Sequence, residues 1–311
     1  MIEGGCDLRI LVITQQKDAT VQYMTENYKN EAQWFRLNVD DIENYEIEIQ
    51  SSGIRIKSNN DEIMGDEIEA VYYRKVAYPD LTTYDPEYHT LIQRELIGLV
   101  EGLVETLGRK CLSRPSILRR AENKIFQLHI AKNVGFQVPD SFITNAGIAA
   151  TQFSKKQLTV VKPLATGTIV NRQGRGIIQT NLVDTNYPIE GLGVAPAYFQ
   201  EYIRKNDGEY RITIIDRTVY AVEIRSSDPV DWRKSGAEND YRLVSVPDEV
   251  IVHCFHMMDL LGISFGAFDF IKRGEEFFFL EVNPNGQWLW LEEKLNIPIS
   301  RSIVTYLTTG C

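Results

Sequence analysis

The chain has few cysteines and histidines, and their spacing excludes several kinds of site. Among 311 residues there are 4 cysteines and 4 histidines. The cysteines are widely scattered and form no C-x-x-C pair, so we expect neither a disulfide framework nor a structural zinc site. His253 and His256 stand three residues apart in an expected helix, but no third metal ligand is near them in the sequence, which favours a structural role.

The chain also lacks a basic excess and a long apolar run. Its formal net charge is −10, whereas sequence-independent binding to nucleic acid needs a basic face. No basic region precedes the short apolar run at 8–14, and no stretch approaches the roughly 20 apolar residues that span a bilayer. We therefore expect a cytoplasmic protein that binds neither nucleic acid nor a membrane.

What is present is the pattern of an α/β protein with two or three domains. The chain is 43% hydrophobic and 24% charged, which is enough to bury more than one core. Strands are expected at 8–14, in a hairpin at 46–58, and in antiparallel pairs at 209–227 and 264–286. Helices are expected at 84–108, at 116–135 as one continuous element, and at 246–262. Between them, 158–180 is expected to form a strand, a glycine-punctuated loop and a second strand.

The C-terminal strand pair ends in an unusual group of oxygen-bearing side chains. Glu281 and Asn283 are two apart in the run "FFFLEVNPNG", so they share one face of the strand. Asp269 lies on the preceding strand, in "GAFDFI". Two carboxylates and an amide oxygen suit Mg²⁺, which prefers oxygen ligands. In the alternative interpretation, Asp269 caps a turn and Glu281 pairs with a nearby base.

The magnesium interpretation depends on how the two strands pair. Residues 272–274 resemble a three-residue loop with Gly274 in the left-handed conformation. If the register puts Asp269 opposite Phe279, Asp269 lies diagonal to Glu281 on the same face. A symmetric two-residue loop would place the two acids on opposite faces. We therefore expect an odd-length or bulged connection.

Cationic side chains that could hold phosphates occur at three places. Lys162 ends an apolar run, and a buried lysine there needs an anionic partner. The loop after it contains Gly167, and such glycine-rich loops can lay backbone N–H groups over phosphates, although no P-loop motif is present. Lys124 stands early in a helix, where sequence alone favours a solvated surface lysine.

Two further segments have both a functional and a structural interpretation. The backbone at the end of "QEYI", residues 200–203, could hydrogen-bond an adenine, but many strands have such an edge. Glu209 and Arg211 share a strand face, where Arg211 could stabilise a transferring phosphoryl group. A structural Glu209–Arg211 pair is equally compatible with the spacing.

Taken in order, these residues resemble the ATP-grasp ligases. The run "GAFDFI … FLEVNPNGQWLWLE" and the segments "AVEIRSS" and "VDWR" are similar, more narrowly, to the graspetide (microviridin-type, omega-ester peptide) synthetases. The resemblance is strong from about 120 to 300 and weak over 1–70. It departs from the family pattern at Lys75, where a second arginine would follow Arg74, so no role is carried over to that position.

The resemblance implies a fold, a set of cofactors and a role for each site residue. It implies a pre-ATP-grasp domain at 1–115, a central ATP-grasp subdomain at 116–199 and a C-terminal subdomain at 200–311, with ATP between the last two. The cofactors would be ATP and Mg²⁺. The ATP-binding residues would be Lys124, Lys162, Gly167, Gln200, Glu201, Ile203 and Glu209, and the metal ligands Asp269, Glu281 and Asn283. Arg211 would stabilise the acyl phosphate, and Arg233 would contact the acceptor peptide or a phosphate.

The activity implied is ATP-dependent macrocyclisation of a ribosomal precursor peptide with a leader and a core. A side-chain carboxylate of Asp or Glu would become an acyl phosphate and condense with a Thr or Ser hydroxyl or a Lys amine, in an enzyme expected to be a homodimer. Three alternatives remain open: another ATP-grasp carboxylate–amine ligase that adds glutamate, a nucleotide-dependent kinase, and a non-catalytic binding module. The first would add the mass of an amino acid, the second would release ADP without condensation, and the third would bind ATP without changing a peptide.

Overall fold

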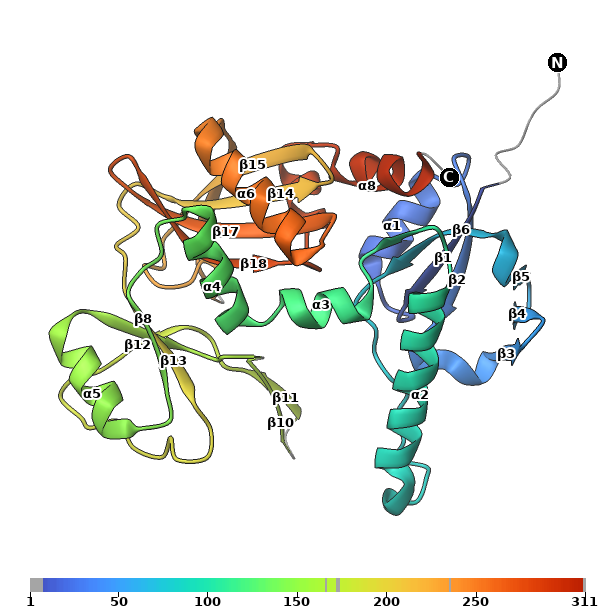
Figure 1. The fold of residues 1–311 in the computed structure, drawn as a ribbon, viewed down its shortest axis with the longest axis horizontal. Helices are drawn as coiled ribbons and strands as arrows, with labels where there is room; N and C mark the ends of the chain where they lie inside the picture. Colours follow the sequence, from blue (N-terminus) through green and yellow to red (C-terminus); the bar gives the residue numbers. More distant parts are fainter. Residues whose placement is uncertain (1–7, 166, 172–173, 235, 310–311) are drawn as a thin grey trace.

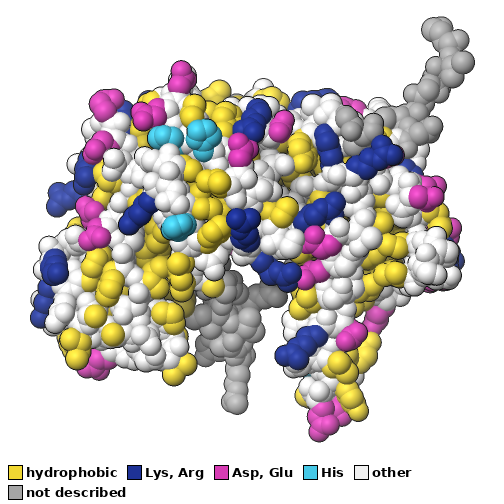
Figure 2. Space-filling model, viewed as in Figure 1, with side chains coloured by type: hydrophobic (Ala, Val, Ile, Leu, Met, Phe, Trp, Pro, Cys, Tyr) yellow, Lys and Arg dark blue, Asp and Glu magenta, His cyan; other side chains and the backbone are white. Residues whose placement is uncertain are grey.

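The computed structural model describes residues 8–165, 167–171, 174–234 and 236–309. The described chain forms three regions, each built on its own sheet (Figure 1). On the face shown in Figure 2, basic and acidic side chains are interspersed, so the negative net charge is not gathered there into one patch. No described helix is long and apolar enough to cross a membrane.

The first region is a parallel sheet in the order β2-β1-β6-β7. Strand β1 is buried on both faces of this sheet, which explains the continuous apolar run at 8–14. Leu11 and Ile13 face a core that contains residues of α2, while Ile10 and Val12 face a core shared with α1 and α8 (Ile299–Thr308). The strands are β1 (Arg9–Thr14), β2 (Gln33–Asn38), β6 (Ile68–Tyr73) and β7 (Lys110–Leu112), and the helices are α1 (Ala19–Asn27) and α2 (Pro86–Thr106).

A small antiparallel sheet completes this region. Its strands are β3 (Tyr45–Gln50), β4 (Gly53–Ser58) and β5 (Glu62–Met64), with short 3-10 helices η1 (Val39–Asn44) and η2 (Gly65–Glu67) beside them. The β3–β4 turn confirms the hairpin predicted at 46–58.

The helix predicted as one element at 116–135 is two helices, so that prediction is wrong. The helices are α3 (Pro115–Ala121) and α4 (Lys124–Val134). The break occurs because the Asn123 side chain accepts a hydrogen bond from the Phe126 N–H at 3.0 Å and caps a new helix. Helix α4 ends at Gly135 in the left-handed conformation, as expected from the sequence.

The second region is a four-stranded sheet in the order β12-β9-β13-β8 with a separate hairpin. Its elements are β8 (Ser141–Thr144), α5 (Gly147–Lys156), β9 (Thr159–Lys162), β12 (Asn181–Leu182) and β13 (Ala197–Glu201). The segment between β9 and β12 forms the hairpin of β10 (Thr168–Asn171) and β11 (Gly174–Ile177).

The third region is a five-stranded antiparallel sheet in the order β16-β15-β14-β17-β18. Its elements are β14 (Glu209–Ile215), β15 (Thr218–Ser226), β16 (Asn239–Leu243), α6 (Asp248–Leu261), β17 (Phe265–Arg273), β18 (Glu276–Asn283), α7 (Leu289–Leu295) and α8 (Ile299–Thr308). One face packs on α4 and α6 around a cluster of phenylalanines that includes Phe268, Phe270 and Phe279. Part of the other face packs on α8 and the first region, and the rest lines a pocket with the second region.

Candidate active site

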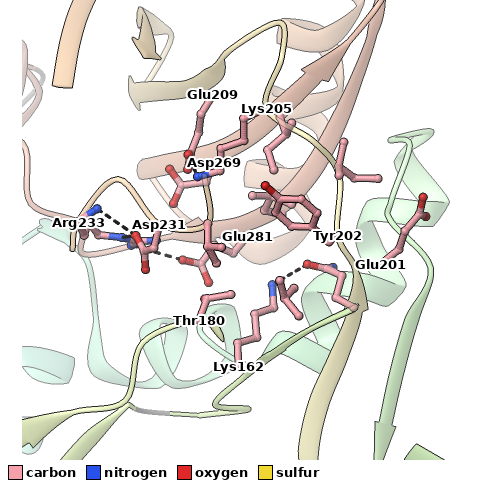
Figure 3. A pocket seen from close by; sticks show the side chains of 16 residues that line it. Lys162, Thr180, Glu201, Tyr202, Lys205, Glu209, Asp231, Arg233, Asp269 and Glu281 are labelled. Carbon is pink, nitrogen blue, oxygen red and sulfur yellow. Dashed lines mark hydrogen bonds and ion pairs between the residues drawn. The ribbon is translucent and has the colours of Figure 1, made fainter. Parts of the chain in front are cut away.

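A pocket lies between the second and third regions, and most of the predicted site residues line it. Lys162 approaches from β9, while Asp269 and Glu281 approach from β17 and β18 (Figure 3). The predicted residues that line this pocket are Lys162, Gln200, Glu201, Ile203, Glu209, Arg233, Asp269 and Glu281. Thr180, Tyr202, Lys205 and Asp231 also line it, and sequence reasoning did not single them out.

Asp269 and Glu281 lie directly opposite each other, through a register that differs from the predicted one. The turn is a two-residue turn at Gly274-Glu275, because Arg273 pairs with Glu276. The three-residue loop at 272–274 is therefore wrong, although Gly274 does have a positive φ of 61°. Phe279 pairs with Phe270 and not with Asp269.

A bulge at Leu280 then shifts the register by one residue. Pairing changes from Phe270–Phe279 to Asp269–Glu281, so Leu280 has no partner on β17. Without the bulge, Glu281 would share the face of Phe279, which points into the core. The bulge turns Glu281 to the pocket. It lies within β18 and not in the connection, so the predicted odd-length or bulged loop is not seen, although the two acids do share one face.

Asp269 is paired with Arg211 in a buried position. Asp269 Oδ1 lies 2.9 Å from Arg211 Nη1, and the two side chains are 2% and 5% exposed. The predicted alternative of a Glu209–Arg211 pair is not seen, since Glu209 pairs with Lys205. Burial raises the pKa of Asp269 even though Arg211 opposes the shift. Neither carboxylate oxygen accepts a hydrogen bond from a described residue.

Glu281 is held by Lys124, which is not the solvated lysine that sequence alone favoured. Lys124 begins α4, and its Nζ lies 2.6 Å from Glu281 Oε2. Arg233 Nη1 lies 3.9 Å from Glu281 Oε1. Burial would raise the pKa of Glu281, but the surrounding cations, Lys124 first among them, outweigh it and hold this pKa well below its usual range.

Lys162 has a neutral partner where an anionic one was predicted. Its Nζ donates to Gln200 Oε1 at 3.0 Å and lies 4.5 Å from the centre of the Tyr198 ring. No carboxylate of the described residues lies within ion-pair distance of it. Burial lowers the pKa of Lys162 to about 8, against the attraction of Glu281. The lysine is therefore available for an anion that enters the pocket.

The segment 200–203 presents its backbone and an apolar wall to the pocket. The Glu201 side chain points away from the carboxylates (Figure 3) and lies 3.6 Å from Arg273. The Ile203 N–H forms no hydrogen bond with the described residues. The side chains that line an apolar slot beside it are Val160, Ile203, Ile271 and Leu280. A planar base with hydrogen-bonding edges fits such a slot.

Lys205 and Asp231, which the sequence did not point to, each bind the side chain of a predicted site residue. Lys205 forms an ion pair with buried Glu209, whose pKa is raised by burial. The two residues lie across the turn before β14 and not on a helix, so their spacing alone gave no signal. Asp231 is 7% exposed, and its Oδ1 accepts from Arg233 Nε at 3.0 Å. The two belong to the run "VDWR", in which only Arg233 was singled out.

A second cavity adjoins the first through Arg233. Arg211 and Asn283 line it together with Lys75, Trp232, Tyr241, Gly286, Gln287, Trp290 and Lys294. Asn283 Nδ2 donates to Glu281 Oε1 at 3.3 Å, which confirms that these side chains share a face. The wall is aromatic and cationic, a combination suited to a carboxylate-bearing peptide.

Gly167 does not line either cavity. It lies beside Ile178, where an added Cβ would come within 2.4 Å of the Ile178 carbonyl oxygen. Residues 172 and 173, in the predicted glycine-rich loop after Lys162, lie outside the described residues.

The donor set fits a divalent cation completed by other oxygens. Within the described ranges, no group of three or more His, Cys, Asp or Glu side chains could hold a metal ion. The two facing carboxylates and the adjacent amide of Asn283 nevertheless form an oxygen-only set, with both Asp269 oxygens lacking a hydrogen-bond donor. Such an incomplete set suits Mg²⁺, which usually keeps waters and substrate phosphates as ligands.

Comparisons with known proteins identify similar folds. Residues 9–117 match the family described as "MvdD pre-ATP grasp domain". A RiPP-associated ATP-grasp ligase of Chryseobacterium gregarium, in complex with ADP and a leader and core peptide, superposes with a TM-score of 0.87 at 26% identity over 98% of this chain and 97% of that one. The macrocyclase MdnC of Microcystis aeruginosa, bound with the precursor peptide MdnA, gives 0.87 at 24% identity over 97% and 100%.

A third similar structure contains Mg. The ATP-grasp ligase PsnB, complexed with a phosphomimetic variant of a minimal precursor, Mg and ADP, gives a TM-score of 0.80 at 23% identity over 97% of this chain and 98% of that one. No curated protein sequence matches this chain.

The fold is that of an ATP-grasp ligase. With its matched N-terminal domain, the chain is similar to the RiPP-associated ATP-grasp ligases.

Proposed function

We propose that this protein is an ATP-dependent peptide macrocyclase. It activates side-chain carboxylates of Asp or Glu in a ribosomal precursor peptide as acyl phosphates. It then condenses them with Thr or Ser hydroxyls, which gives esters, or with Lys amines, which gives amides. The main support is that Asp269 and Glu281 face each other at the pocket. The cations near them are Lys124, Lys162, Arg211 and Arg233. Structural neighbours of the chain are bound to leader and core or precursor peptides.

ATP is proposed to bind between the second and third regions. The adenine would lie in the apolar slot beside Ile203, with the backbone of Gln200 and Glu201 at its edge, and Lys162 and Lys124 would hold the phosphates. Lys162 is suited to this because its present partner is a neutral amide. Glu209 would reach the nucleotide from β14, while Gly167 would act only through the backbone near the β10–β11 hairpin.

Magnesium is proposed to bind at Asp269, Glu281 and Asn283, where it would neutralise charge on the phosphates and help to orient them. Lys124 and Arg211 neutralise the two carboxylates in this structure. Both cations would then be released toward the phosphates, Arg211 toward the phosphoryl group that is transferred.

The core of the precursor is proposed to enter the second cavity. Arg233 lines both cavities, so it can contact the acceptor carboxylate and the transferred phosphoryl group together. Positioning and charge neutralisation are the main demands of such a transfer.

The test is condensation of the precursor peptide itself. The protein is incubated with a candidate precursor peptide that carries a leader and a core, Mg²⁺ and ATP, and the mass of the product is measured. Loss of one water mass per ring, matched by ADP release, is the expected result, and treatment with mild base then separates esters from amides. A mass gain of one amino acid would instead establish a glutamate-adding ligase, and ADP release without condensation would establish a kinase.

The homodimer, the cytoplasmic location and the domain boundaries at 115 and 199 stay predictions. Size-exclusion chromatography with light scattering tests the first of them directly.

A further inference from the structure

A buried arginine of the first region holds residues 284–287, the metal loop that follows Asn283. Arg74 comes directly after β6, and its side chain is 1% exposed. Its Nη1 donates to the Gly286 carbonyl at 3.4 Å, and its Nη2 donates to the side-chain oxygen of Gln287. This contact joins residues 212 positions apart and ties the first sheet to the end of β18.

Arg74 is in turn oriented by Asp18. Asp18 Oδ2 lies 3.7 Å from Arg74 Nε and accepts a hydrogen bond from Thr14 Oγ1 at 2.8 Å. Asp18 Oδ1 accepts from the N–H groups of Thr20 and Val21 at 3.0 and 3.1 Å, as the N-cap of α1. A buried carboxylate with this many donors is a rigid anchor for the arginine.

The loop is also confined on its other side. An added Cβ at Gly286 would lie 2.8 Å from the Ala267 Cβ, so the loop packs closely on β17. Ala267 is the register partner of Asn283, and its carbonyl accepts from Arg211 Nη1 at 3.2 Å. A shift of this loop would therefore move Asn283 and disturb the support of Arg211.

We infer that Arg74, oriented by Asp18, is a positioning residue for the metal site. By holding the loop at Gly286 and Gln287 it fixes Asn283, so the N-terminal domain takes part in metal–nucleotide binding. This inference rests on the proposed role of Asn283 as a metal ligand. A contact that only joined two domains would change stability without changing how ADP binding depends on Mg²⁺.

The test measures ADP binding to the full-length protein by calorimetry, with and without Mg²⁺. The variants are Arg74→Gln, Arg74→Lys and the matched control Tyr28→Phe. Tyr28 bonds to Ser300 at 2.8 Å, so the control also removes a contact between distant parts of the chain but leaves the metal loop intact. We expect equal ADP affinity without Mg²⁺ in all proteins. The Mg²⁺ gain, which is the factor by which Mg²⁺ increases ADP affinity, should fall roughly 10- to 100-fold in Arg74→Gln. It should partly recover in Arg74→Lys and stay at the wild-type level in Tyr28→Phe.

A folded Arg74→Gln protein with the wild-type Mg²⁺ gain would overturn the inference. If Arg74→Gln does not fold, Gln287→Ala decides, because Gln287 is exposed and its loss removes one partner of Arg74. A reduced gain in that variant supports the inference, and an unchanged gain overturns it. A wild-type protein without any Mg²⁺ gain would instead overturn the proposed metal site, and this inference with it.

Discussion

Two carboxylates that face each other in the candidate site are held in opposite ways. Asp269 is almost fully buried, and the desolvation of its carboxylate raises its pKa despite the nearby Arg211. Glu281 is surrounded by cations that lower its pKa. Glu281 therefore stays ionised over a wide pH range, whereas ionised Asp269 depends on a positive charge beside it, from Arg211 or from a metal ion.

Removing the charge of Asp269 should slow the reaction strongly. In Asp269→Asn the amide oxygen can still face Arg211, so we expect the fold to persist, while turnover of precursor falls about 100-fold or more because a charged group is lost where phosphoryl transfer is stabilised. Glu281→Gln should behave in the same way. Product mass and circular dichroism check both points.

The control for this experiment is Asp259→Asn. Asp259 pairs with Arg217 at 2.8 Å on the surface, where both side chains are 57% exposed. The same chemical change there should leave turnover unaffected. Unchanged activity in Asp269→Asn or Glu281→Gln would contradict the magnesium assignment.

The charge of Lys162 should make nucleotide binding depend on pH. Its pKa is lowered to about 8, chiefly by burial, so its positive charge is lost as the pH rises through that value. ADP affinity should therefore fall between about pH 7 and about pH 9, and Lys162→Arg should remove this dependence because arginine stays charged. Calorimetric titration across this range is the measurement.

Unfolding should not disturb that comparison. Between the folded pKa of about 8 and the ordinary value of 10.5, the unfolded chain binds more protons at this lysine than the folded chain does. The contribution of Lys162 to the free energy of unfolding therefore becomes more favourable to the folded state as the pH rises. An equal loss of affinity in wild type and Lys162→Arg would assign the pH dependence to another group.

Among the elements, α4 shows how a local signal places a site residue. The side chain of Asn123 caps the helix, and the first helical residue is Lys124, which reaches Glu281 on β18. The cap separates α4 from α3 and sets where Lys124 begins its helix. A continuous helix, as predicted, would lack this starting point.

Loss of the cap should destabilise the protein modestly. Asn123→Ala removes the acceptor for the Phe126 N–H, so the free energy of unfolding should fall by about 1 kcal/mol. Asn123→Asp keeps an acceptor and should stay close to wild type. Urea denaturation compares the two, and equal stability of the Ala and Asp variants would contradict the capping role.

At the scale of the whole molecule, one hydrophobic cluster joins the first and third regions. It contains Ile10 and Val12 of β1, Ala267 of β17 and residues of α8, including fully buried Ile303. Helix α8 lies against the first region in Figure 1, although it comes last in the sequence. The contact between Arg74 and the metal loop is thus made within a packed interface.

Removing volume from this interface should destabilise both regions together. Ile303→Ala should lower the free energy of unfolding by about 2–5 kcal/mol, as for other buried large-to-small changes. The denaturation midpoints measured by tryptophan fluorescence and by far-ultraviolet circular dichroism should fall together. Thr305→Ala, on the exposed side of the same helix, should have little effect. A shift confined to one probe would contradict the shared core.

Much of the fold followed from patterns that act over short distances. Alternation of apolar and polar residues indicated the hairpin at 46–58 and the facing of Glu281 and Asn283. The error at 116–135 arose because Asn123 can be either exposed within a helix or a cap, and periodicity alone does not distinguish the two. The error at 272–274 arose because several turn lengths fit the same glycine.

The sequence by itself determined the chemistry available to this protein: oxygen ligands at the end of one strand, an acid on its neighbour, and cations in the strands and helix before them. Only the tertiary structure decided which cation meets which acid. Lys124 and Glu281 are 157 positions apart, and Arg211 meets Asp269 through strand pairing. Strand periodicity is a property of the local backbone, whereas ion pairs, the bulge at Leu280 and the hold of Arg74 on the metal loop depend on how distant elements pack.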